Sequence, residues 1–142
     1  MQIRILDTKN NIDIRRCFRV FFHLRPQLDE TEFVRRVQVQ AAEGYTIAYI
    51  ESGEEVVAAA GYRVLHFLAW GKILYLDDLI TNPDKKKTGY GSALLEWVSQ
   101  KGKELGCDEL HLDTGYQRHD AHRLYLKSGL DLSCHHLSKK LN

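Results

Sequence analysis

The sequence of 142 residues lacks a long apolar run, an excess of charge of one sign and a cysteine framework. No apolar stretch approaches the roughly 20 residues that a membrane-spanning helix needs, and the start, Met1-Gln2-Ile3-Arg4, does not have the pattern of a secretory signal peptide. The net charge of +1 provides no strong field for nucleic acid or an anionic membrane. Three scattered cysteines without a C-x-x-C motif are typical of a reducing compartment, so we expect a cytoplasmic protein.

Repeats, low-complexity tracts and internal linkers are also missing. Hydrophobic residues make up 44% of the chain and charged residues 27%, which is typical of a soluble globular protein. The length is that of one domain, so we expect a single domain over residues 1–142.

Two familiar phosphate-binding motifs are absent as well. The chain has no G-x-x-x-x-G-K-S/T loop, and the pair Gly89-x-Gly91 is followed by Leu94 where a dinucleotide-binding motif has a third small residue. A third arrangement is nevertheless present around this pair. An apolar strand over 73–80 is broken by Thr81-Asn82-Pro83-Asp84, and apolar residues at helical spacing follow from Ser92 to the glycine at 106.

A glycine-rich turn between a strand and a helix exposes backbone N–H groups at the positive end of the helix dipole. Glycine also lets the backbone approach an anion closely. The lysines at 85–87 add positive charge, and the turn is therefore a candidate phosphate or pyrophosphate site. The alternative is an ordinary helix start with solvated lysines.

The rest of the pattern predicts a mixed α/β domain. We expect a strand over 1–6, helices over 14–22 and 30–41 with Asp29 as a cap, and three hairpin-linked strands over 45–51, 55–67 and 73–80. The long helix follows, then a strand over 109–113 parallel to the 73–80 strand, a short helix capped by Asp120, and a final strand or hairpin piece over 130–141. The order is β-α-α-β-β-β-α-β-α-β, with a mostly antiparallel central sheet flanked by helices.

The glycine turn resembles the acetyl-CoA signature of the GNAT acetyltransferase superfamily, R/Q-x-x-G-x-G/A after a strand that ends L-x-V-x-P. Here the strand ends Leu79-Ile80-Thr81-Asn82-Pro83 and the signature reads Lys86-Lys87-Thr88-Gly89-Tyr90-Gly91. Lys86 replaces the usual Arg or Gln and Thr81 the usual Val. Lysine keeps the charge without the planar fork of arginine, so we expect binding to survive. The element order is similar to the GNAT fold over nearly the whole chain.

The resemblance implies an acyltransferase that moves an acetyl group from acetyl-CoA to a primary amine by direct attack in a ternary complex. It implies that Leu79, Ile80 and Thr81 hold the pantetheine arm, and that the pyrophosphate binds the loop residues Lys86, Lys87, Thr88, Gly89, Tyr90, Gly91 and Ser92. Arg118 stands where many members have an Asn that touches CoA; it is a candidate for cofactor phosphate or substrate carboxylate, or a solvated loop arginine. No metal is implied.

The resemblance also implies catalytic residues. In Ala121-x-x-x-Tyr125-x-x-x-Gly129-Leu130, the tyrosine stands where the family has an acid for the thiolate; otherwise Tyr125 is a core aromatic. For the base the candidates are Asp77, then Asp78, then Tyr75. Strand alternation would put Asp77 and Asp78 on opposite faces. Because a carboxylate is costly to bury without a partner, the alternative is an ion pair with a nearby arginine.

The sequence contains no motif that identifies the acceptor. We expect the acceptor-binding site around Phe22, His23, Arg25 and Gln27, and the acidic residues at 77, 78 and 113 hint at a cationic amine. The partner is a small-molecule or protein amine, and a homodimer that covers exposed strand edges is a further expectation. Two non-catalytic alternatives stay open: an acyl-CoA-binding sensor on the same fold, and an interaction domain whose glycine turn is only structural.

Overall fold

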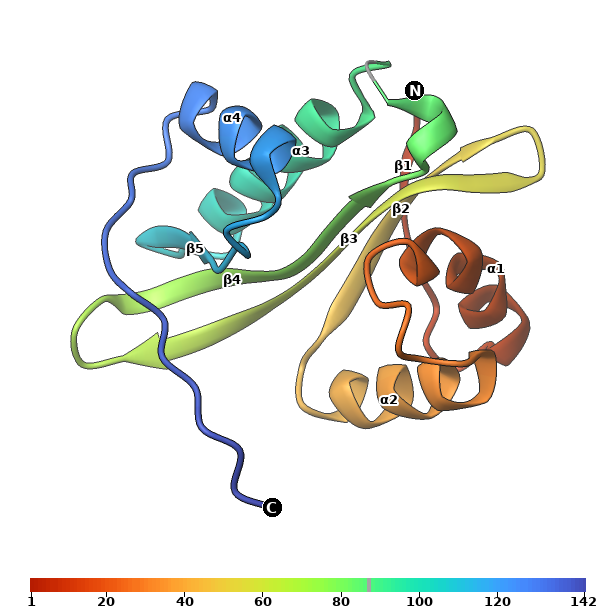
Figure 1. Cartoon of the computed structure of the whole chain (residues 1–142), viewed down its shortest axis with the longest axis horizontal. Coiled ribbons are helices and arrows are strands. Elements are labelled where there is room, and N and C mark those ends of the chain that lie inside the picture. The colour runs from red at the N-terminus through yellow and green to blue at the C-terminus, as the bar shows by residue number, and fades with distance from the viewer. Residues whose placement is uncertain (87) are drawn as a thin grey trace. The chain divides into compact units, whose positions relative to one another are not determined.

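The structure is a computed structural model that describes residues 1–86 and 88–142. It divides into two compact units, Met1–Leu112 and Asp113–Asn142, which are described in turn. Figure 1 shows the elements, which in chain order are β1 (Ile3–Ile5), α1 (Asn11–Phe22), α2 (Glu30–Ala42), β2 (Thr46–Ser52), β3 (Glu55–Phe67), β4 (Gly71–Thr81), the short 3-10 turn η1 (Pro83–Lys85), α3 (Tyr90–Glu104), β5 (Glu109–Leu112) and α4 (His119–Lys127).

The first unit is built on a five-stranded sheet in the order β1-β2-β3-β4-β5. Each of the first three strands pairs antiparallel with the next, and β4 pairs parallel with β5. The parallel pair is the expected result of a strand, a helix and a strand joined by a crossover. The predicted mixed, mostly antiparallel sheet is confirmed, and the predicted bounds of β3 agree with the structure to the residue.

Strand β4 contains a β-bulge at Asp77. Asp78 lies opposite Gly61 and Leu76 lies opposite Tyr62, so Asp77 is an extra residue between two paired ones. An extra residue interrupts the alternation of side chains along the strand. The expectation that Asp77 and Asp78 lie on opposite faces of a regular strand is therefore wrong, because it assumed an unbroken register.

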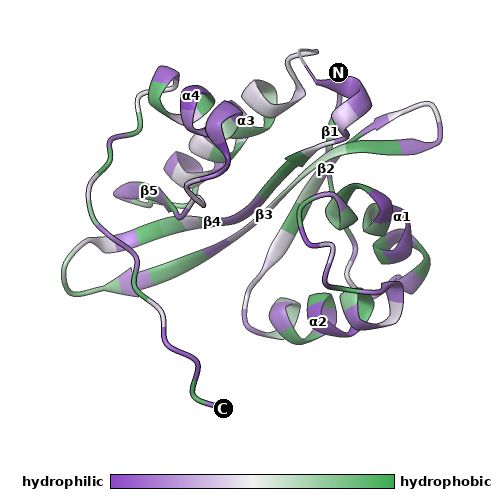
Figure 2. Ribbon diagram, in the orientation of Figure 1, coloured by the Kyte–Doolittle hydropathy of each residue, from purple (hydrophilic) through white to green (hydrophobic). Residues whose placement is uncertain are grey.

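Helices cover both faces of this sheet. Figure 1 shows α1 and α2 on one side and α3 on the other. The central strands are rich in hydrophobic residues, green in Figure 2, whereas hydrophilic residues in purple are frequent on α1 and α2. The largest fully buried side chains of the core come from helices and strands alike: Ile14, Ile47, Ile50, Ile73, Leu74, Leu94, Leu95, Val20, Val57, Val98 and Cys17. Burial of these side chains holds the strands that carry the candidate site in place.

The second unit contains α4 and the chain that follows it. Gly129, with φ of +92°, ends the helix as predicted, and the Leu130 N–H donates to the Tyr125 carbonyl at 3.0 Å. The Asp120 prediction is wrong: Arg118 is the N-cap residue and Asp120 is already helical, where it pairs with Arg123.

The final strand expected over 130–141 is not formed. Residues 130–142 are all described, and none of them is in a helix or a strand. The leucines at 132, 137 and 141 are exposed. The segment has residues that favour a strand, but it does not pair with any described strand of the same chain. The prediction of a single domain over 1–142 stays a prediction. Among the helices that the structure describes, none is long and apolar enough to cross a membrane.

Candidate active site

Helix α3 begins differently from the two helices before it. Asn10 caps α1 by accepting from the N–H groups of residues 12 and 13, and Asp29 caps α2 by accepting from the N–H of residue 32. The cap position of α3 is Gly89, which has φ of +84° and no side chain to accept such bonds. The first N–H groups of α3 therefore lack the internal acceptor that α1 and α2 have, and an external anion is a suitable partner for them.

The turn before α3 is held by its own polar side chains. Asn82 Oδ1 accepts from the N–H of Asp84 at 3.0 Å, and the Thr88 hydroxyl donates to the carbonyl of Lys85. Thr88 thus shapes the turn through its side chain, while Lys86 is exposed and Tyr90 is half-buried. The predicted contact residue Lys87 lies outside the described residues. A Cβ added at Gly89 would meet nothing within 4 Å, so its positive φ and not crowding explains the glycine.

The strand that precedes this turn is β4. Its parallel register with β5 ends at Leu76 and Leu112, whereas its antiparallel register with β3 continues to Thr81. Leu79 and Ile80 are buried and Thr81 is half-buried. Strand β5 thus pairs only with the first part of β4. The second part of β4 leads directly into the turn before α3.

Asp78 is held by two groups that come from distant parts of the chain. Arg25, in the segment after α1, donates to Asp78 Oδ1 from Nε at 3.0 Å and from Nη2 at 2.8 Å. Tyr45, just before β2, donates its hydroxyl to Asp78 Oδ2 at 2.6 Å. Burial and the charge of Asp78 raise the pKa of Tyr45 well above its ordinary value, so its hydroxyl is a hydrogen-bond donor at neutral pH.

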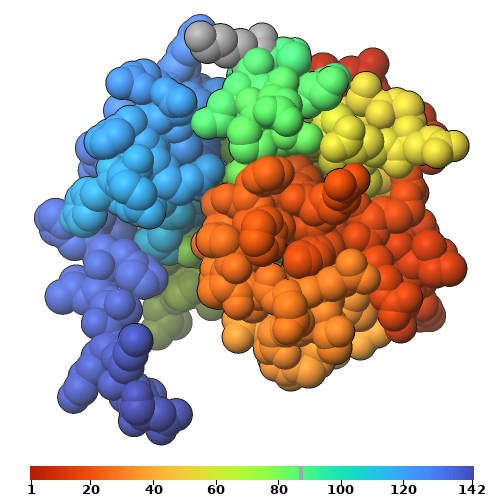
Figure 3. Space-filling view, turned by 45° about the vertical axis from the view of Figure 1, so that its right-hand side comes forward, coloured from red at the N-terminus to blue at the C-terminus, as the bar shows by residue number. Residues whose placement is uncertain are grey.

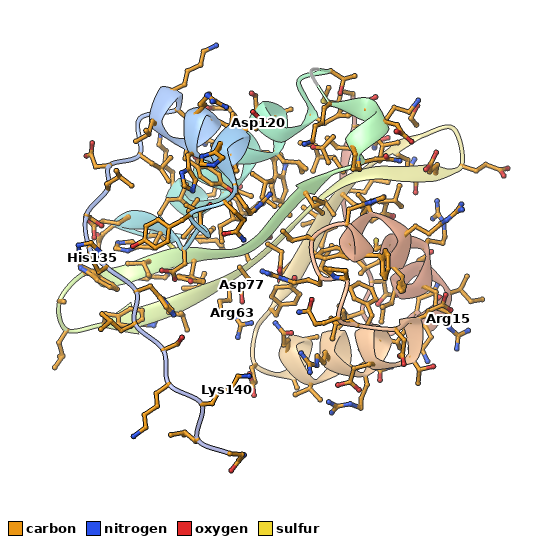
Figure 4. All side chains as sticks on the ribbon, viewed as in Figure 1. Arg15, Arg63, Asp77, Asp120, His135 and Lys140 are labelled. Carbon is orange, nitrogen blue, oxygen red and sulfur yellow. The ribbon has the colours of Figure 1, made fainter. Side chains whose placement is uncertain are left out.

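Asp77 has an arginine of its own. Arg63 on β3 donates to the Asp77 carboxylate from Nε at 3.1 Å and from Nη2 at 2.7 Å, and its guanidinium lies 5.3 Å from the centre of the Tyr45 ring. Figure 4 labels Arg63 and Asp77, which lie together near the middle of the long strands. Burial raises the pKa of Asp77, and the hydrogen bonds and charge of Arg63 offset this only in part.

The bulge thus brings both carboxylates into one polar cluster, composed of Arg25, Tyr45, Arg63, Asp77 and Asp78. Both aspartates form ion pairs with arginines, which is the alternative that the sequence left open. The acidic residues at 77 and 78 therefore give less support to a cationic acceptor than the sequence suggested. Tyr75, the third candidate base, is half-buried on the same strand.

Gly61 makes room for the cluster. It lies opposite Asp78, and a Cβ added there would lie 1.8 Å from the Tyr45 hydroxyl oxygen. Any larger residue would collide with the tyrosine that holds Asp78. The sequence contained no local sign of this requirement, since residues 45, 61 and 78 are far apart in the chain.

A cavity of about 170 Å³ opens beside the cluster. Its lining comes from the end of α1, the segment between the helices, α2, Tyr45 and β4: Phe21, Arg25, Gln27, Leu28, Phe33, Arg36, Val37, Gln40, Tyr45 and Asp78. Figure 3 shows the segment between the helices and α2, in orange, at the surface of the first unit. Arg25 and Gln27, which the sequence suggested for the acceptor side, line this cavity; Phe22 and His23 are not among its lining residues.

In the second unit, Tyr125 is buried with 6% of its surface exposed. Burial raises its pKa, and the charge and side-chain hydrogen bond of Arg118 act in the opposite direction. Arg118 and Tyr125 are therefore neighbours at the start and near the end of α4. His122 Nε2 lies 2.7 Å from the carbonyl oxygen of Gly115, which fixes the turn before the helix. Within 1–86 and 88–142, no cluster of three or more His, Cys, Asp or Glu residues has the arrangement needed to hold a metal ion.

Comparison with known proteins gives consistent matches. The model of the acetyltransferase (GNAT) family matches residues 11–130. An uncharacterized N-acetyltransferase of Bacillus subtilis is 28% identical over 107 residues, which are 75% of each chain. An aminoalkylphosphonate N-acetyltransferase of Salmonella typhimurium is 32% identical over 77 residues, which are 54% of this chain and 49% of that protein.

The fold is also found among solved structures. A transcriptional regulator from Bacillus halodurans superposes with a TM-score of 0.84 at 21% identity, and the match covers 99% of this chain and 100% of that one. At this identity the likeness concerns the fold alone.

Proposed function

Because this chain belongs to the acetyltransferase (GNAT) family and is an acyltransferase, we propose that it transfers an acetyl group from acetyl-CoA to a small primary amine by direct attack in a ternary complex. One observation carries the proposal: the strand that bears Asp77 and Asp78 leads directly into a helix that starts on a glycine without a side-chain cap. In this proposal, a carboxylate pair and a candidate anion site would lie at the two ends of one short segment.

The residues present fit the donor. The first N–H groups of α3 and the positive end of its dipole suit a pyrophosphate, and the exposed Lys86 adds charge. Leu79, Ile80 and Thr81 come just before this turn, at the distance in the chain where a pantetheine arm would extend along β4. When bound, acetyl-CoA supplies a thioester carbonyl carbon to which the amine nitrogen bonds as the bond to sulfur breaks.

The base proposed for this reaction is Asp78. A base must lie within hydrogen-bond reach of the amine proton, and Asp78 lines the cavity whereas Asp77 does not. Asp78 would accept the proton that the nitrogen loses. Asp77 would hold Arg63, which in turn packs on Tyr45. A backbone N–H near Leu79 would stabilise the negative charge that develops on the carbonyl oxygen.

Tyr125 is the proposed acid that returns a proton to the departing sulfur. Its burial keeps the hydroxyl protonated, and Arg118 limits how far its pKa rises, which keeps the proton available. Arg118 would act through Tyr125 and would be a positioning residue. Removal of the hydroxyl in Tyr125→Phe should lower kcat about 10-fold or more with little change in acetyl-CoA affinity.

The likeness to the Salmonella aminoalkylphosphonate N-acetyltransferase supports a small-molecule acceptor over a protein amine. The cavity volume of about 170 Å³ supports it too, since it is below the ~300–1,000 Å³ of pockets for drug-sized ligands. No feature of the described residues favours the sensor or the interaction domain. The homodimer stays a prediction.

The test is calorimetric titration of acetyl-CoA, and of analogues cut before the pyrophosphate, into the purified protein. We expect micromolar binding that depends on the pyrophosphate, followed by acetylation of at least one member of an amine panel. A folded protein that does not bind acetyl-CoA would refute the proposal. Binding without acetylation of any amine would favour a sensor.

A further inference from the structure

We propose that the cavity beside α2 selects acceptors that carry an anionic group, a carboxylate or a phosphonate, on the same small molecule as the primary amine. This inference rests on the proposed function. The sequence hinted at a cationic acceptor because Asp77 and Asp78 are acidic. The structure reverses the hint, because each of these carboxylates is paired with an arginine and the cavity is lined by a further arginine, Arg36.

The charged side chains that line the cavity are Arg25, Arg36 and Asp78, which are two cations and one anion. Asp77, just outside it, is balanced by Arg63. The lining side chains therefore carry an excess of one positive charge before any ligand binds, whereas Glu32, which Arg36 contacts, lies outside the lining and is shared with Arg35. A purely cationic acceptor would add to this excess, whereas a zwitterion would add no net charge and could place its anionic group beside the arginines.

Both cavity arginines keep donors for a ligand. Arg25 donates from Nε and Nη2 to the carboxylate of Asp78 and from Nη2 to the carbonyl of Asp77. Arg36 donates from Nε to the carboxylate of Glu32. Within the described part of the chain, Nη1 of Arg25 and both Nη atoms of Arg36 have no hydrogen-bond acceptor. A guanidinium has five N–H donors in a planar fork that matches carboxylate and phosphonate oxygens. Gln27 and Gln40 add neutral amides to the same lining.

The same cavity also provides for the amine. Asp78 is the negative group of the lining, and Tyr45 holds it with its hydroxyl. Phe21, Leu28, Phe33 and Val37 complete the wall with apolar surface. A short carbon chain that joins an amine to an anion therefore matches the lining in charge, polarity and size.

The experiment compares acceptors that differ only in the anion. 3-Aminopropionate and 2-aminoethylphosphonate are the carboxylate and phosphonate arms, propylamine is the arm without a second charged group and 1,3-diaminopropane is the cationic arm with a second ammonium group, all assayed with acetyl-CoA at saturation. We expect kcat/KM for the better anionic arm to exceed that for propylamine about 10-fold or more, and the cationic arm to be the poorest. Comparison of kcat/KM for 3-aminopropionate and 2-aminoethylphosphonate shows whether the site prefers a carboxylate or a phosphonate.

Two neighbouring arginines on α2 provide a matched pair of variants. Arg35 and Arg36 both bond to Glu32, but Arg36 lines the cavity and Arg35 does not. Arg36→Gln should raise KM for the anionic acceptor about 10- to 100-fold and leave KM for propylamine within about twofold. Arg35→Gln should leave both KM values nearly unchanged. Acetyl-CoA affinity, measured by calorimetry, should be the same in both variants.

The outcomes separate this inference from the proposed function. If propylamine or 1,3-diaminopropane is acetylated as well as the anionic acceptors, or if Arg35→Gln and Arg36→Gln behave alike, the inference is wrong while the acetyltransferase activity stands. If no amine is acetylated and acetyl-CoA does not bind, the proposed function itself is wrong.

Discussion

The turn before α3 and the cavity beside α2 are two proposed sites that would offer charge to a ligand in different ways. At the start of α3 the donors are backbone N–H groups, made available because Gly89 has no side chain to cap them. In the cavity the charges belong to side chains, Arg25, Arg36 and Asp78, that come from three separate segments. The first site depends on a backbone conformation, and the second depends on a network of contacts.

This difference sets how each site responds to substitution. A site made of N–H groups tolerates most changes of side chain but not a change of the φ that positions it. A site made of paired side chains tolerates no loss of one partner, because the remaining charge is left without compensation. The following substitutions test that contrast, in order of decreasing effect.

Asp78→Asn should have the largest effect and is the sharpest test of the network. The change keeps the shape and removes the proposed base, so kcat should fall about 100-fold or more. Asp77→Asn is the matched control, and we expect a loss of less than about 10-fold. Rates are to be measured at saturating acetyl-CoA. A reversed order, with Asp77→Asn the more damaging, would move the base to the carboxylate that does not line the cavity.

Gly89→Ala tests the backbone site. With φ of +84°, a non-glycine residue is strained, and we expect acetyl-CoA affinity to fall about 10-fold as the first turn of α3 shifts. Gly44→Ala is the control, since Gly44 has φ of +94° and equally open surroundings but follows α2. Both variants should lose about 1 kcal/mol of stability. Equal acetyl-CoA affinity in calorimetry would contradict an anion site at α3.

Gly61→Ala tests how tightly the network is packed. The new Cβ would lie 1.8 Å from the Tyr45 hydroxyl oxygen, so Tyr45 must move, and we expect a loss of about 1–3 kcal/mol in the free energy of unfolding. In a Tyr45→Leu background the same change should cost much less. Gly102→Ala, where the nearest atom is a Leu74 carbon at 3.6 Å, should be neutral or slightly stabilising. Additive losses in denaturant titrations of the double variant would show that the two residues do not collide.

The smallest effect concerns pH. The pKa of Asp77 is raised in the folded protein, so the stability that its protonation contributes is present below the unfolded pKa of about 3.9 and is lost as pH rises through the folded pKa. The Asp77→Asn variant has no carboxyl group at this position, so it does not lose this stability as pH rises. Its unfolding free energy relative to the parent should therefore increase from pH 3 to neutral pH. A constant difference over that range would contradict the raised pKa.

The parts of the molecule that the sequence predicts well are those fixed by neighbours in the chain. The β3 strand, the glycine turn and the Asp29 cap all depend on residues a few positions apart. The bulge at Asp77 is different, because it is a property of how β3 and β4 register and not of either strand. The partners of the two aspartates are different as well: Arg63, Tyr45 and Gly61 have no motif, and only the cost of burying two carboxylates indicated that partners must exist.

The missing final strand has a similar cause. Residues 130–141 have a composition that is compatible with a strand, but a strand needs a neighbour that offers N–H and C=O groups, and the order of the five-stranded sheet does not include this segment. The Asp120 cap fails for a local reason, since the helix begins at His119. The first error concerns whether an element exists, which depends on distant partners, and the second concerns where a helix begins, which is less predictable than its centre.

The Arg25–Asp78 contact has a consequence for the time course of folding. Its two residues are 53 positions apart, and Tyr45 and Asp78 are 33 apart, whereas the turn before α3 joins residues only a few positions apart. Closing long loops is entropically costly and slow relative to forming local turns. We expect a newly made chain to form the start of α3 early and to assemble its polar cluster late, so that the proposed anion site would form before the proposed base is in place.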